Sequence, residues 1–288
     1  DAWRVDIADE EATIDILYKG GKGYGICRVR SFSTSTSVAI ETLVSFKGLG
    51  YSEDWQECRY NSKVGWPNGV VLSNGRLVWM GPDKIDMSVS DAYASFDDGF
   101  PGDAGPVSRG IAVGGRNKAL WGISMAALII GCDSRIVAVR ASTLGEVITP
   151  TNFNVLPISK VVARDRSPLE LGDDRALFMH SSNLSLQEIF WDSGSGGYAV
   201  APYSRLSSDL FLTGFSDMAY QTAPDKRIWV TVTEEDAATD TLGAICIVDD
   251  ASTDTLAAHI PLQSAASTQS GVDYLDKFHC VATLSSDD

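Results

Sequence analysis

The sequence predicts an all-β fold, and more closely a β-propeller built of four-stranded blades that follows a small β module. Short apolar runs separated by glycine, proline, asparagine and aspartate fill most of the chain, which is typical of strands joined by tight turns. Clusters of these runs recur at intervals of roughly 40 to 50 residues, as propeller blades do. Helical periodicity is nearly absent, and only residues 207–214 have the capping serine and terminal glycine of a short helix.

Residues 1–62 are predicted to form the small β module, either a β-barrel or a β-sandwich. Strand-like runs lie at residues 12–17, 24–29 and 38–46. The glycine-rich residues between the first two runs superficially suggest a phosphate cradle. A P-loop, however, needs its lysine before a serine or threonine at the start of a helix, whereas Lys22 precedes Gly23 and a second strand. A hairpin turn is therefore predicted there.

Residues 65–96 give the clearest strand signal in the chain. Three short apolar runs, at residues 70–72, 76–80 and 84–89, are separated by Ser73-Asn74-Gly75 and by Gly81-Pro82-Asp83. Runs of this length with such turns predict a meander of adjacent antiparallel strands.

The rest of the chain repeats this pattern, so residues 63–288 are predicted to form the propeller. Further clusters span residues 120–139, 161–191 and 218–262, and a partial one spans 274–284. Residues 126–130 are apolar on both faces, as in an inner strand, while residues 228–232 alternate as a half-buried strand does. The propeller is expected to be incomplete at its C-terminal end, in a piece of a longer protein. A β-sandwich with long loops is the structural alternative.

The charge and cysteine content exclude some classes of protein. A formal charge of −15 argues against a surface that grips nucleic acid, because phosphate binding relies on lysine and arginine. It is compatible with a duct past which DNA slides, or with solubility alone. No apolar run approaches the roughly 20 residues of a membrane span. The five scattered cysteines predict buried free thiols, which fits assembly in a reducing cytoplasm.

No residue pattern in the chain predicts catalysis, a cofactor or a metal site. The three histidines, His180, His259 and His279, have no metal-ligand spacing and are predicted to lie in the core or at strand ends. Acidic turns, such as the one that begins at Asp97, do not match a calcium loop and are predicted to be solvated loop tips. The seven tryptophans are spread about one per cluster, which favours blade core or inter-subunit packing over a sugar-binding platform.

The order of these motifs resembles the tail nozzle, or tail-hub, proteins of tailed bacteriophages. The motif that opens the propeller in that family is matched by Gly65-Trp66-Pro67, Arg76-Leu77 and Ser88-Val89-Ser90, followed by Tyr93 and Phe96. Later matches lie at residues 128–131, 134–137, 148–153, 176–179, 187–192 and 221–229. Near the start, Gly23-Tyr24-Gly25 and Ser33-Thr34-Ser35-Thr36 match a small β-barrel insertion, so the resemblance implies that residues 1–62 form a β-barrel-like module.

The resemblance also implies a function. It predicts a structural, non-enzymatic virion protein, assembled in the host cytoplasm, that forms a homo-oligomeric ring, commonly a hexamer, around the DNA-ejection channel. Its expected partners are the adaptor and portal-proximal proteins and the tail fibres, and the genome would pass through without specific binding. Two alternatives stay open: a receptor-binding or polysaccharide-degrading propeller of the tail, and a host propeller scaffold. The host, the stoichiometry, the blade count and the channel-lining loops do not follow from the sequence.

Overall fold

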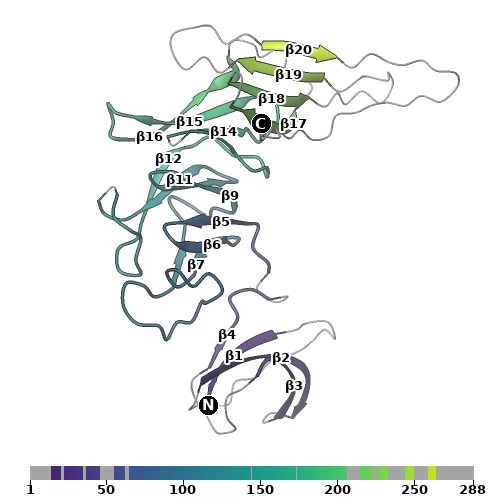
Figure 1. The fold of residues 1–288 in the computed structure, drawn as a ribbon, viewed down its shortest axis with the longest axis vertical. Coiled ribbons are helices and arrows are strands. Elements are labelled where there is room, and N and C mark those ends of the chain that lie inside the picture. Colours follow the sequence, from purple (N-terminus) through teal and green to yellow (C-terminus); the bar gives the residue numbers. More distant parts are fainter. Residues whose placement is uncertain are drawn as a thin grey trace, which may run out of the picture. The chain divides into compact units, whose positions relative to one another are not determined.

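The computed structural model in Figure 1 describes most of the chain between residues 14 and 263. The described residues are 14–20, 23–34, 37–45, 55–61, 65–143, 145–172, 174–205, 215–222, 226–232, 244–249 and 259–263. Within these ranges the only helix is a single 3₁₀ turn at residues 203–205. The predicted short helix at 207–214 and the partial cluster at 274–284 lie outside the described residues, as does His279.

All described strands belong to four-stranded antiparallel sheets. The N-terminal sheet has the order β3-β2-β1-β4, with β1 (Ile14–Gly20), β2 (Gly23–Thr34), β3 (Ser37–Val44) and β4 (Trp55–Glu57). The next sheet is a meander of β5 (Gly69–Ser73), β6 (Arg76–Met80), β7 (Lys84–Met87) and β8 (Val107–Gly110). Three more meanders follow: β9 (Ala119–Ser124), β10 (Leu128–Cys132), β11 (Ile136–Arg140) and β12 (Asn154–Ser159); β13 (Leu169–Gly172), β14 (Arg175–Met179), β15 (Leu186–Asp192) and β16 (Gly197–Pro202); and β17 (Phe215–Gln221), β18 (Arg227–Val232), β19 (Ala244–Asp249) and β20 (His259–Gln263).

The chain divides into two compact units. The first contains Asp1–Ala112 and Val147–Phe153, and the second contains Val113–Glu146 and Asn154–Asp288. The first unit therefore holds the N-terminal sheet and the β5–β8 sheet, and the second holds the three later meanders. The predicted domain boundary after residue 62 follows the end of the N-terminal sheet at Glu57 and stays a prediction.

The turn between β5 and β6 shows how local sequence sets these meanders. Asn74 and Gly75 have φ angles of 51° and 69°, and Ser73 pairs with Arg76, so the loop has two residues. Asparagine followed by glycine is the pair that tolerates positive φ at both positions, and the resulting twist matches that of the flanking strands. The apolar alternation of β6 then buries Val78 and Met80 on one face.

The core of the second unit lies between sheets that stack face to face. One cluster joins the β9–β12 sheet to the β13–β16 sheet through residues such as Trp121, Ile129 and Phe178. Another joins the β13–β16 sheet to the β17–β20 sheet through Leu177 and Ile228. Corresponding strands meet, since β12 lies against β16 and β13 against β17. Three sheets stacked in succession are the arrangement of propeller blades, and they differ from the two layers of a sandwich.

The structure confirms the predicted fold class in part. The chain is all-β, its sheets have four strands, and the predicted strands at 70–72, 76–80 and 128–131 are present. β10 is buried at every position, as the apolar run predicts. The predicted strand at 84–89 ends at Met87, because the Ser88 carbonyl turns to the Arg76 guanidinium. The predicted cluster at 161–191 is displaced, since its first strand begins at Leu169 and its last ends at Pro202. Closure of the sheets into a propeller ring stays a prediction.

Candidate functional site

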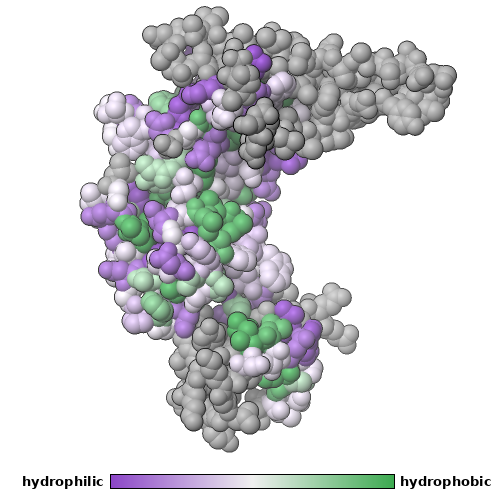
Figure 2. Space-filling model, viewed as in Figure 1, coloured by the Kyte–Doolittle hydropathy of each residue, from purple (hydrophilic) through white to green (hydrophobic). Residues whose placement is uncertain are grey.

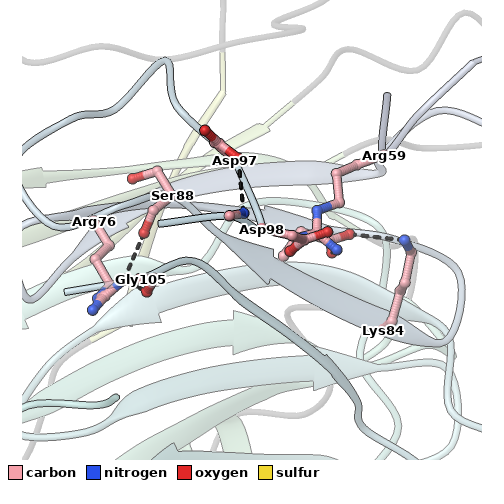
Figure 3. A network of polar contacts seen from close by, with 9 residues as sticks. Arg59, Arg76, Lys84, Ser88, Asp97, Asp98 and Gly105 are labelled. Carbon is pink, nitrogen blue, oxygen red and sulfur yellow. Dashed lines mark hydrogen bonds and ion pairs between the residues drawn. The ribbon is translucent and has the colours of Figure 1, made fainter. Parts of the chain in front are cut away.

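A buried arginine organises the loop that covers one end of the β5–β8 sheet. The Arg76 side chain comes from β6 and is 1% exposed. One terminal nitrogen donates to the carbonyl oxygens of Ser88 at 2.7 Å and Gly105 at 2.6 Å, and the other donates to the carbonyl of Asp103 at 2.7 Å. Figure 3 shows the Arg76 side chain beside Ser88 and Gly105. Because these bonds replace water, the residue is retained as a cation although burial lowers its pKa.

A buried carboxylate fixes the connector that runs from β4 to β5. Asp86, on β7, is 0% exposed, and its two oxygens lie 3.1 Å from Lys84 Nζ and 3.5 Å from Arg59 Nη1. Arg59 also pairs with Asp98 from the loop after β7, and Figure 3 shows these side chains converging. Breaking such a pair would leave a charge in a poorly solvated position. The ion pairs therefore hold the connector and the loop against the same sheet.

Aromatic side chains add to the contacts that hold the connector against the sheet. The Tyr60 ring stacks on Trp79 with centroids 5.7 Å apart, and Phe96 meets Trp79 edge-on at 6.2 Å. Lys84 Nζ lies 5.2 Å from the centre of the Tyr60 ring. Burial, and then the negative charge of Asp86, raise the pKa of Tyr60 far above its ordinary value. Tyr60 therefore stays protonated near neutral pH, and the cluster is built to anchor the connector.

The first strand of the same sheet, the edge strand β5, has an exposed face. Trp66, Val70 and Leu72 are 63%, 59% and 60% exposed, the largest values among the exposed large hydrophobic side chains of the described residues. Val70 and Leu72 point to the same face because strand side chains alternate. Figure 2 shows hydrophobic side chains gathered where Figure 1 places β5. We call Trp66, Val70 and Leu72 the β5 surface.

The β5 surface is also uncharged. From Gly65 to Gly75 the sequence GWPNGVVLSNG contains no ionisable side chain, in a chain whose formal charge is −15. Apolar and uncharged surface of this kind is where proteins associate, because its burial removes apolar area from water without desolvating charge. The candidate functional site of this chain is therefore an interaction surface.

The described histidine and the acidic turn that were singled out in the sequence make local hydrogen bonds that shape turns. His180 Nδ1 lies 2.8 Å from Ser182 Oγ and 3.0 Å from the Ser182 nitrogen, so the ring shapes a local turn. Asp97 accepts a hydrogen bond from the Gly99 nitrogen at 2.8 Å, as an aspartate in a solvated turn does. Within the described residues there is no group of three or more histidine, cysteine or acidic side chains placed to hold a metal. Strands β1 and β2 pair as the predicted hairpin requires, with Gly20 opposite Gly23.

The thiols and tryptophans follow the predictions in part, since Cys58 is only partly buried and Trp66 is exposed. Cys27 and Cys132 are buried, none of the described cysteines is in a disulfide, and burial raises the pKa of Cys132 to about 12. Trp121 is 3% exposed in the core, whereas Trp66 is open to solvent. Cys280 lies outside the described residues. No helix in the described residues has the length and hydrophobicity of a membrane span.

The sequence analysis missed the roles of Arg76 and Asp86. Each is a charged residue at an inward position of an otherwise apolar strand, RLVWM and KIDM. An ionisable residue at such a position must find partners, and this was the available signal. The exposure of Val70 and Leu72 had no such signal, since alternation separates two faces without saying which one is covered.

Comparison with known proteins assigns the chain to no family. No protein-family model matches the chain, and no curated protein matches it. Among solved structures, the chain is similar to a luciferin-regenerating enzyme, with 11% identity and a TM-score of 0.39. The match covers 73% of this chain and 66% of that one, slightly under two thirds of that protein's length.

This finding corrects the functional predictions made from the sequence. The protein matched is an enzyme and no part of a phage tail, so the predictions of a non-enzymatic tail nozzle subunit and of a tail receptor-binding or polysaccharide-degrading propeller are wrong by this comparison. The likeness is too low to carry that enzyme's activity to this chain. The resemblance to nozzle proteins stays a prediction, because no family model and no curated relative matches.

Proposed function

We propose that this chain is a propeller-type protein whose working form is a homo-oligomer, assembled through strand β5. The face-to-face stacking of successive four-stranded meanders supports the propeller. The observation that carries the oligomer is the exposure of Val70 and Leu72 on the uncharged strand β5, and of Trp66 in the segment just before it.

β5 is the edge strand without protection. Edge strands usually carry a bulge, a charge, a proline or very few residues, which prevent pairing with another chain. The ladders of β3, β9, β12, β13 and β17 are interrupted by register shifts. β4 has three residues, β8 carries Arg109, and β16 and β20 contain Pro202 and Pro261. Among the described edge strands, β5 alone has a regular ladder, no charge and no proline.

The free edge of β5 has the hydrogen-bonding groups for a two-fold contact. In a two-residue hairpin the pair that closes the turn, Ser73 and Arg76, is hydrogen-bonded, so by alternation Val71 directs its backbone groups to β6. On the opposite side of β6, the Leu77 carbonyl accepts a hydrogen bond from the Ser88 nitrogen, and the Leu77 nitrogen donates to Ser88 Oγ. Leu77 therefore directs its backbone groups away from β5, as this alternation requires. Val70 and Leu72 then direct their N–H and C=O groups to the free edge.

A second copy of this chain fits that edge. Antiparallel pairing about Val71 would place Val70 of each copy opposite Leu72 of the other, so that both cross-strand pairs are apolar. The two-fold axis makes the contact self-complementary. Two acidic chains would meet where neither carries charge, whereas a basic partner would gain nothing from this strand. The single sequence Val70-Val71-Leu72 thus supplies both halves of the interface.

The test measures association in solution. We expect the purified chain to sediment as an oligomer at micromolar concentration and Leu72→Lys to sediment as a monomer, because the change places an unpaired charge opposite Val70 in both cross-strand pairs. Val147→Lys is the matched control, since Val147 is 53% exposed and lies off the β5 surface. A wild-type chain that is monomeric at all accessible concentrations, or a Leu72→Lys variant that associates as the wild type does, contradicts the proposal.

A further inference from the structure

A groove opens between the outer strands of two stacked sheets in the second unit. It holds a cavity of about 120 Å³ within an open space of about 450 Å³. Ala138, Arg140 and Leu156 line it from the β9–β12 sheet, and Trp191 and Tyr198 line it from the β13–β16 sheet. An apolar cavity of about 150 Å³ accepts a benzene ring. The cavity here is somewhat smaller than that, so a ring would lie partly in the cavity and partly in the open space of the groove.

The groove carries a cation and no carboxylate. Arg140 is the one ionisable cation in the lining, and no aspartate or glutamate contributes to it. No ion pair or hydrogen bond joins the Arg140 guanidinium to any described residue, while its backbone pairs with Asn154 in the sheet. Asp192, next to Trp191, instead accepts a hydrogen bond from the Gly194 nitrogen at 3.0 Å. In a chain with a formal charge of −15, a partly buried guanidinium without a carboxylate is a position prepared for an anion.

The aromatic wall adds a flat surface and a second donor. The rings of Trp191 and Tyr198 lie 5.2 Å apart in an edge-to-face arrangement. The Tyr198 hydroxyl oxygen accepts a hydrogen bond from the Ala126 nitrogen at 3.0 Å, so its own hydrogen is left to donate. Burial raises the pKa of Tyr198, which keeps that hydrogen in place at neutral pH. The polar side chains of the groove therefore offer donors, and the aromatic rings offer packing for a planar or cyclic group.

We infer that this groove binds a small ring compound that carries one carboxylate. The carboxylate pairs with the Arg140 guanidinium, the ring packs against Trp191, and an oxygen of the ring or its substituents accepts the Tyr198 hydrogen. Sugar acids and aromatic acids both have this chemistry. The site is separate from the β5 surface, so it stands or falls independently of the proposed oligomer.

The test compares each acid with its uncharged counterpart by calorimetric titration of the full chain. Glucuronate is paired with methyl glucoside, and benzoate with benzyl alcohol. We expect one acid or both to bind roughly tenfold to a hundredfold more tightly than the neutral counterpart, the range for a hydrogen bond to a charged group. Preference for glucuronate identifies a sugar acid, and preference for benzoate identifies an aromatic acid.

Variants locate the binding and keep the inference falsifiable. Arg140→Gln is expected to remove the preference for the acid, and Trp191→Ala to weaken all ring binding, with unchanged thermal unfolding as the check that each variant folds. Arg166→Gln is the control, since Arg166 is exposed and lies outside the groove. Absence of binding by all four compounds, equal binding of acid and neutral compound, or an Arg140→Gln variant that keeps its preference would overturn the inference.

Discussion

Asp86 is the buried charge around which the ion pairs of the β5–β8 sheet are arranged. It is fully buried, it faces Lys84 and Arg59, and it lies beneath the aromatic anchor of the connector. A buried carboxylate of this kind gains stability only while its cationic partners are present, because removal of either side leaves an uncompensated charge.

Replacement of Asp86 is expected to cost far more than replacement of its exposed neighbour. Asp86→Ala should lower the free energy of unfolding by about 3 kcal/mol, since Arg59 and Lys84 lose their common partner. Asp98→Ala should lower it by under about 1 kcal/mol, because the Asp98 side chain is 61% exposed. Urea denaturation monitored by tryptophan fluorescence measures both. Equal losses for the two variants would show that the buried pairs do not anchor the sheet.

Tyr60 predicts how stability changes at alkaline pH. Its pKa is raised in the folded chain, so above about pH 10, the ordinary value for tyrosine, the unfolded chain releases a proton that the folded chain retains. Stability is therefore fully present below that pH and falls as pH rises further. We expect Tyr60→Phe to show a shallower loss of unfolding free energy between pH 9 and 11 than the wild type, while Tyr93→Phe, a change at an exposed tyrosine, keeps the wild-type slope. Identical slopes in all three proteins would refute this account.

At the scale of elements, close packing between strands explains a glycine in a fully buried strand. Gly131 lies in β10 opposite Trp121 in β9, and a Cβ at this position would lie 2.1 Å from an indole carbon. The indole is held in place, because its nitrogen donates to the Arg164 carbonyl at 3.1 Å. The sheet therefore requires glycine at position 131, because the Trp121 indole occupies the space that a Cβ would need.

Gly131→Ala tests this packing directly. The indole must move or lose its hydrogen bond, and we expect a loss of about 1 to 3 kcal/mol of unfolding free energy, the usual cost of overpacking a core. Gly172→Ala is the control, because a Cβ there meets no atom within 4 Å. Thermal unfolding of the two variants gives the comparison. A Gly131→Ala variant as stable as the control would mean that Trp121 has another position.

The elements were predictable because local rules act within each of them. Alternation and the Asn74-Gly75 turn predicted the β5–β6 hairpin. The apolar run at 126–130 predicted a strand buried on both faces, which the structure places two residues later, at Leu128–Cys132, with Ala126 exposed in the turn before it. Strand ends were less predictable, since the end of β7 depends on Arg76 reaching Ser88 from another strand. The β5 surface was not predictable, because whether a face is covered depends on chain far away in sequence.

At the scale of the whole molecule, the functional prediction rested on the order of the motifs, and the net charge could not test it. A formal charge of −15 fitted an acidic duct, yet net charge speaks to solubility and partners and not to fold. The distribution of charge is more informative than the net charge. The β5 strand carries no charge, and Arg140 is a cation without a carboxylate in its groove, so both differ locally from the acidic character of the chain. Both of the surfaces proposed here follow from that difference.

The most direct measurement of the proposed assembly is oxidative cross-linking at its symmetry axis. Val71→Cys would place two thiols opposite each other in a non-hydrogen-bonded antiparallel pair, where side chains approach most closely. We predict a disulfide-linked dimer through residue 71 under mild oxidation, identified by peptide mass spectrometry, and no such product from Ser108→Cys on the opposite edge of the same sheet. If residue 71 forms no cross-link, or forms one no faster than residue 108, copies of this chain do not meet at β5.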